Sequence, residues 1–140
     1  MSFRETLPEE EAYQLNPLKL AYIGDTVWEM LIREELIREN LNVNRMHRQC
    51  VGRVNAAAQS GSARQMEGLL TGRETDIFHR GRNAHAHHPS PKHQNPRDYA
   101  MATGLEAVFG YLYLTGQDGR IRELFEQASG RDGTWLSPDN

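Results

Sequence analysis

Two carboxylates stand in unusual positions, each inside one of the most apolar stretches of the sequence. Asp25 lies in LAYIGDTVWEML and Glu106 lies in ATGLEAVFGYL, and neither acid has a Lys or Arg three or four residues away. An ionised carboxylate that is buried without a partner costs several kcal/mol, or its pKa rises until it is neutral. Both acids therefore need a partner from elsewhere in the fold.

We expect that partner to be a hard divalent cation, Mg²⁺, held by Asp25 and Glu106 together. Carboxylates, waters and phosphate oxygens are the ligands that Mg²⁺ prefers. The alternative is that each acid lies at the edge of its helix or bonds to a buried hydroxyl group, because single acids are rarely fully buried.

Three glycines accompany these acids. Gly24 precedes Asp25, and Gly104 and Gly110 flank Glu106. A glycine inside a helix costs up to about 1 kcal/mol relative to alanine, which is tolerable where a second backbone must approach closely. The glycines favour two helices that bring their acids to one metal, and ordinary tight helix packing explains them equally well.

A basic, histidine-rich segment separates the two acids. Between Thr71 and Asp98 there are five basic residues against three acids, together with five of the six histidines. If the chain binds nucleic acid, its phosphates are expected here. Imidazoles also bind transition metals, but the cluster of His85, His87 and His88 lacks a fourth ligand at a fixed spacing. Chance composition or a pH-dependent phosphate contact explains that cluster better.

The elements that must position these groups are predicted to be helices. Asn16-Pro17 and Asn95-Pro96 each combine an N-cap residue with proline at the first helical position, so we expect helices at about 17–38 and 96–115. Shorter helices are expected at 45–59 after an Asn44 cap, at 62–72 after a Ser62 capping box, at 74–82 and at 118–129. The pattern predicts one all-α domain over residues 1–140, with 1–12 and 131–140 frayed and a loop at 83–94.

Composition narrows the class of protein. The chain has 140 residues, 25% of them charged, and a formal net charge of −3, which disfavours a protein that coats nucleic acid without specificity. No apolar run approaches the roughly 18 residues that span a bilayer, and the acidic N-terminus is unlike a signal peptide. Cys50 is the only cysteine, so an intrachain disulfide is excluded and a cytoplasmic location is expected.

Two segments resemble the ribonuclease III family. Ala21–Glu29 (AYIGDTVWE) is similar to the signature segment of that family, and Gly104–Leu114 (GLEAVFGYLYL) is similar to its second acidic helix. The order and separation of the segments agree with the family as well. Arg80–Ala84 (RGRNA), between them, completes a pattern similar to Mini-ribonuclease III, the reduced form that consists of the catalytic domain alone.

The resemblance implies a compact helical domain that forms a homodimer through its signature helix. It implies Asp25 and Glu106 as catalytic residues and Mg²⁺ ligands, and hydrolysis of double-stranded RNA that leaves a 5′-phosphate and a 3′-hydroxyl. The implied substrate is the precursor of large-subunit ribosomal RNA, and a large-subunit ribosomal protein is an open possibility as a partner. Two further acids of the family correspond to Ala21 and Thr103 in this sequence, so the number of metals stays open. The role of Glu29 is also open.

In this context the basic segment becomes the expected RNA contact. Double-stranded RNA is recognised mainly through its shape, phosphates and 2′-hydroxyls, and the alternative is a solvated loop. Two other functions compete, namely a double-stranded-RNA-binding module of the same fold without catalysis, and a helical interaction protein whose acids fix the dimer register. The expected RNA-binding residues are Arg80, Arg82, Asn83, Lys92 and Arg97.

Overall fold

The computed structural model describes residues 3–84 and 94–129, and within them every regular element is a helix. None of these helices is both long enough and apolar enough to cross a membrane. The all-α prediction is confirmed. The helices are α1 (Glu9–Tyr13), α2 (Pro17–Ile37), α3 (Val43–Val54), α4 (Ala56–Glu67), α5 (Gly72–Asn83), α6 (Pro96–Leu114) and α7 (Asp118–Ala128).

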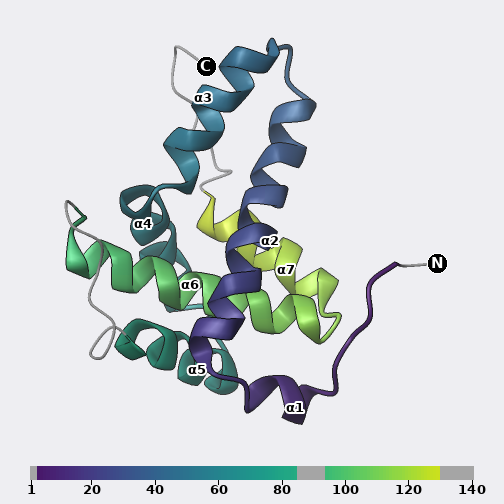
Figure 1. Ribbon diagram of the computed structural model, residues 1–140, viewed down its shortest axis with the longest axis vertical. Coiled ribbons are helices and arrows are strands. Elements are labelled where there is room, and N and C mark those ends of the chain that lie inside the picture. The colour runs from purple at the N-terminus through teal and green to yellow at the C-terminus, as the bar shows by residue number, and fades with distance from the viewer. Residues whose placement is uncertain (1–2, 85–93, 130–140) are drawn as a thin grey trace.

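Helix α6 runs through the centre of the domain, and α2 crosses it diagonally (Figure 1). The crossing is close because it is made by glycines. A methyl group at Gly24 would overlap the carbonyl oxygen of Glu106, and one at Gly110 would overlap the carbonyl oxygen of Leu20. Gly24 and Gly110 therefore permit contact between two backbones, which fits both interpretations of the sequence, whereas Gly104 lies against Phe78 of α5.

Aromatic side chains fill the core beside this crossing. The ring of Trp28 in α2 packs edge-to-face against Phe109 of α6 and Phe125 of α7, with ring centroids 5.2 Å apart in both pairs. All three side chains are buried, and such pairs stabilise a core beyond the burial of their area. This buried cluster ties α2 to both α6 and α7.

A buried ion pair connects α5 with α7. Glu74 is only 4% exposed, and its carboxylate accepts hydrogen bonds from Nε and Nη2 of Arg120 at 3.0 and 2.8 Å. Glu74 also completes a capping box with Thr71. Burial alone would raise the pKa of Glu74, but the bonds from Arg120 and Thr71 outweigh it and lower that pKa. This bidentate pair fixes the start of α5.

The N-terminal segment differs from the frayed conformation expected for residues 1–12. Its described part contains α1 and is attached to the end of α6 and to α7: the Leu7 amide donates to the Leu114 carbonyl at 2.7 Å, and Arg4 pairs with Asp118 at 2.6 Å. Residues 131–140, also expected to be frayed, lie outside the described residues.

The two Asn-Pro starts are confirmed, because Asn16 and Asn95 cap α2 and α6 with their side chains. The single helix predicted at 45–59 is wrong. The helix begins earlier than expected, with Asn42 as its N-cap in place of Asn44. It ends before Asn55, whose side chain accepts a hydrogen bond from the Ala58 amide at 2.9 Å and donates one to the Gly52 carbonyl at 3.0 Å. The predicted Ser62 cap is also wrong, because Ser62 is buried inside α4.

The crossing yields a stability prediction. Gly24→Ala places a methyl group against a backbone that cannot move aside, so we expect a loss of at least about 1–3 kcal/mol in the free energy of unfolding, measured in urea. Gly61→Ala is the matched control, because a methyl group in the middle of α4 meets nothing within 4 Å. That variant should gain up to about 1 kcal/mol, and equal effects of the two substitutions would contradict the close crossing.

Candidate active site

The helix crossing brings the two predicted acids into contact. The carboxyl groups of Asp25 and Glu106 interact, since the charge of Asp25 and a side-chain hydrogen bond with it both raise the pKa of Glu106, although 81 positions separate them in the sequence (106 − 25). Neither Asp25 nor Glu106 has a basic side chain within reach along its own helix. The pairing that the sequence predicted from two isolated acids is therefore present in the fold.

The expectation that both acids are buried is wrong in detail. Asp25 is exposed, and Glu106 is half-buried. The reason is that α2 leaves one of its faces uncovered within the chain, and Asp25 shares that face with Tyr22 and Thr26, which are exposed too. Glu106 instead points from the central helix α6 into the space between α2 and α4.

A third residue, Gln59 of α4, completes the site. Its Nε2 donates a hydrogen bond of 3.2 Å to Oε2 of Glu106. The break at Asn55 makes this contact possible, because it redirects the chain so that the first turn of α4 lies beside α6. Gln59 was missed by the sequence interpretation, which placed it at the end of a continuous helix. The signal that could have found it is Asn55, a poor residue inside a helix and a good one at its start.

The electrostatics of the site are unfavourable for a carboxylate. Burial, the negative charge of Asp25 and the hydrogen bond with Asp25 together raise the pKa of Glu106 to about 8, and only the amide of Gln59 opposes this rise. These causes favour the protonated form of Glu106 at neutral pH when no cation is bound. The pair is thus an anionic, all-oxygen site that a divalent cation could occupy in place of that proton.

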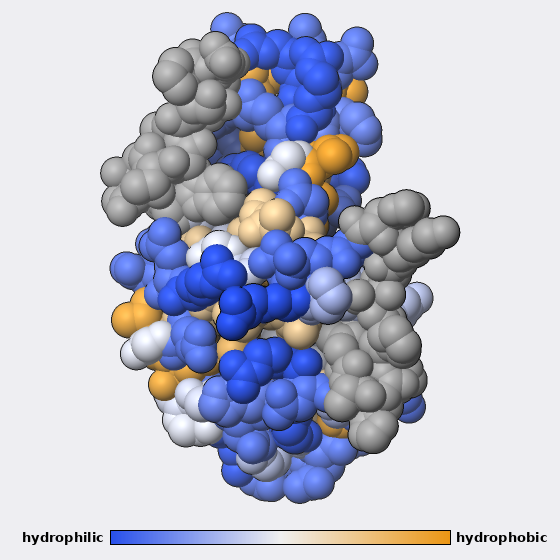
Figure 2. Space-filling model, turned by 90° about the vertical axis from the view of Figure 1, so that its left-hand side faces the viewer, coloured by the Kyte–Doolittle hydropathy of each residue, from blue (hydrophilic) through white to orange (hydrophobic). Residues whose placement is uncertain are grey.

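Two hollows open on either side of the pair. Glu106 and Gln59 line the first, of about 530 Å³, together with the beginning of α6. Asp25 and Glu29 line the second, of about 410 Å³. The side of the molecule on which α4 and the first turns of α6 lie is covered mainly by hydrophilic residues (Figure 2), which suits a polar ligand better than an apolar one.

Within residues 3–84 and 94–129, no cluster of three or more His, Cys, Asp or Glu side chains is able to hold a metal. Asp25 and Glu106 are therefore the two acids proposed to hold a metal. Ala21 and Thr103, which correspond to the two further acids of the family, supply no carboxylate. Glu29, one turn beyond Asp25, is held by Arg33 at 2.6 Å. The histidine cluster at residues 85–88 lies outside the described residues.

The predicted RNA-binding residues fall into different environments. Asn83 at the end of α5 and Arg97 at the start of α6 are exposed, whereas Arg82 is half-buried beside Phe78. Arg80 is half-buried: it pairs with Asp76 of its own helix α5 at 3.1 Å and donates to the Tyr13 carbonyl at the end of α1 at 2.9 Å. Lys92 lies outside the described residues.

Known proteins resemble this chain in both sequence and fold. The family model described as Ribonuclease III domain matches residues 18–117. The chain is 40% identical to Mini-ribonuclease 3 of Clostridium tetani, over 92% of this chain and 91% of that protein. It is 43% identical to Mini-ribonuclease 3 of Symbiobacterium thermophilum, over 82% and 88% of the two chains. A crystal structure of a Fusobacterium nucleatum protein, 26% identical, superimposes with a TM-score of 0.74 and covers 81% of this chain and 90% of that one.

The raised pKa of Glu106 has a consequence for stability. Without divalent metal, the folded chain holds this proton more tightly than the unfolded chain, whose glutamate keeps a pKa of 4.5. The stabilisation is therefore complete below pH 4.5 and is lost as the pH rises to about 8. Glu106→Gln removes the titration, so in EDTA the melting temperature of the wild type should fall relative to that of the variant between about pH 5 and pH 8.

The control for this comparison is Glu39→Gln, which changes an exposed acid beyond the end of α2. Its melting temperature should follow that of the wild type at every pH. Parallel pH profiles of the wild type and Glu106→Gln would contradict the raised pKa of Glu106.

Proposed function

The chain belongs to the ribonuclease III family and is an endoribonuclease, and we propose that it cleaves double-stranded RNA with Mg²⁺ held by Asp25 and Glu106. The observation that carries this proposal is the contact between two carboxyl groups from the two helices that cross most closely. Hard oxygen donors that repel each other fit a divalent cation, so the residues fit the metal on which the family generally depends.

Bound there, Mg²⁺ would supply an activated water and charge stabilisation at the scissile phosphate. The chain's own part is to release the proton of Glu106 and to present two carboxylates from rigid helices. The glycine crossing fixes both backbones, so little reorganisation is needed when the substrate arrives. Hydrolysis at such a site leaves a 5′-phosphate and a 3′-hydroxyl.

For the substrate, we propose the double-stranded stem of a large-subunit ribosomal RNA precursor. The support is the similarity to Mini-ribonuclease 3 proteins over most of the chain and the hydrophilic face beside the site. Arg97 is exposed in the first turn of α6, next to residues that line the hollow with Glu106, so we propose that it contacts a phosphate, with Asn83, Arg82 and Lys92 as further candidates. Arg80 is assigned a different role, since its guanidinium already attaches α5 to α1.

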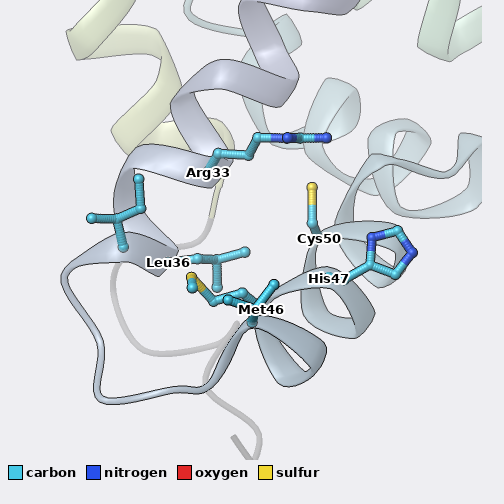
Figure 3. A pocket seen from close by; sticks show the side chains of 7 residues that line it. Arg33, Leu36, Met46, His47 and Cys50 are labelled. Atoms are coloured by element: carbon cyan, nitrogen blue, oxygen red, sulfur yellow. The ribbon is translucent and has the colours of Figure 1, made fainter.

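We further propose that the active form is a homodimer that pairs through α2. Tyr22 and Ile37 on this helix are 85% and 70% exposed, which is costly for large apolar side chains on an isolated chain. A hollow of about 230 Å³ between the end of α2 and α3 extends this face. In it, Arg33 and Cys50 project toward each other beside Leu36 and Met46 (Figure 3). Pairing along this face would also shield the exposed side of Asp25.

The central test is cleavage of a long RNA duplex with and without Mg²⁺. Asp25→Ala and Glu106→Ala each remove half of the carboxylate pair, so we expect cleavage to fall by at least about 100-fold with helical content intact. Glu39→Ala, which changes an exposed acid beyond the end of α2, should cleave at the wild-type rate. Cleavage near the wild-type rate by either site variant, or by the wild type in EDTA, would refute the proposed metal site.

The RNA contact makes a separate prediction. Arg97→Ala should weaken duplex binding uniformly across sequences and reduce the slope of log affinity against log salt concentration by about 1, because one phosphate contact is lost. Arg80→Ala should leave that slope unchanged and instead lower the melting temperature, since it cuts the attachment of α5 to α1. Gel-shift titrations at several salt concentrations measure the slopes, and a reversed assignment of the two arginines would contradict the placement.

A further inference from the structure

Gln59 is an unusual residue for its position. It is 3% exposed, in the first turn of a helix whose other buried positions are Ser60, Ser62, Ala63 and Met66. Burying an amide costs free energy unless it is hydrogen-bonded. The amide of Gln59 donates a hydrogen bond to Oε2 of Glu106. Its polar group therefore interacts with the candidate active site and not with the other residues of α4.

The direction of this bond is informative. The amide nitrogen donates and the carboxylate oxygen accepts, which occupies one oxygen of Glu106 from the side of α4. The same carboxyl group meets Asp25 from the side of α2. Glu106 therefore has two partners, and Gln59 is the one that carries no charge.

Gln59 also borders the space in which a substrate would lie. It lines the hollow of about 530 Å³ together with Glu106, Thr103 and Asn95. A residue that both faces this hollow and bonds to a metal-binding carboxylate is placed to fix the orientation of that carboxylate while RNA enters.

We propose that Gln59 is a positioning residue for Glu106, whose buried amide fixes the glutamate carboxylate in the orientation that binds Mg²⁺. The inference rests on the proposed function, because it concerns the same metal site. Partners that hydrogen-bond to metal ligands commonly contribute 10- to 100-fold, roughly, to metal affinity or activity. With only two acids in this site, the orientation of each matters more than in a site with four.

The test compares Gln59→Met with Gln59→Asn and with the control Gln65→Met. Methionine keeps the volume of glutamine and removes the donor, whereas asparagine keeps the amide and withdraws it from Glu106 by one methylene. Gln65 is exposed on the same helix, so its substitution removes an amide of no assigned role. Mg²⁺ binding to the RNA-free protein is measured by calorimetry, cleavage is measured against Mg²⁺ concentration, and melting temperatures report on folding.

We expect Gln59→Met and Gln59→Asn to weaken calorimetric Mg²⁺ binding and to raise the Mg²⁺ concentration for half-maximal cleavage by about 10- to 100-fold. Saturating Mg²⁺ should restore much of the rate, and Gln65→Met should match the wild type throughout. A role in packing alone would lower the melting temperature and leave Mg²⁺ affinity unchanged.

Wild-type Mg²⁺ affinity in a folded Gln59→Met or Gln59→Asn variant would overturn the inference while leaving the proposed function intact. The two variants differ in volume, so the asparagine variant decides the question if the methionine variant does not fold. Absence of Mg²⁺-dependent cleavage by the wild type would instead refute the proposed function itself.

Discussion

Where α2 crosses α6, the backbone of Gly24 lies against the carbonyl group of Glu106, and the backbone of Gly110 lies against that of Leu20. This approach is possible only without side chains at the two glycines, and it sets the distance between the helices. Since Asp25 follows Gly24 directly, the approach also determines that its carboxyl group meets that of Glu106. Packing and chemistry thus share one cause, and the aromatic cluster around Trp28 holds the crossing in place.

The acid pair is electrostatically unfavourable, because burial and the charge of Asp25 raise the pKa of Glu106. In the proposed function, a divalent cation held by both carboxylates would relieve this repulsion. Glu74, which is only 4% exposed, is instead neutralised within the chain by Arg120, with two hydrogen bonds of 3.0 and 2.8 Å. The contrast with Glu106, which has no basic partner along its own helix, supports the proposal that Glu106 belongs to a metal site.

The sequence predicts much of this site because its signals are local. Isolated acids in apolar helices, glycines beside them and Asn-Pro starts all carry information within a few residues. The all-α fold and the two Asn-Pro starts are confirmed, and the role of the two acids stays a prediction. The break at Asn55 was not predicted, because the apolar pattern continues through it and the preference for capping is weak evidence alone. Gln59 and the contact of Arg80 with α1 depend on which helices become neighbours, and that information lies in tertiary packing. The exposure of Asp25 could not be predicted either, since it depends on which face of α2 the chain leaves uncovered.

The proposed function requires a divalent ion between the carboxylates of Asp25 and Glu106. The most direct measurement is a crystal structure of the protein soaked in Mn²⁺, with an anomalous difference map collected at the manganese edge. We predict a peak coordinated by the carboxylate oxygens of both Asp25 and Glu106, with the amide of Gln59 still bonded to Glu106. A fully occupied Mn²⁺ site elsewhere on the chain, with the two carboxyl groups still in direct contact, would contradict the account.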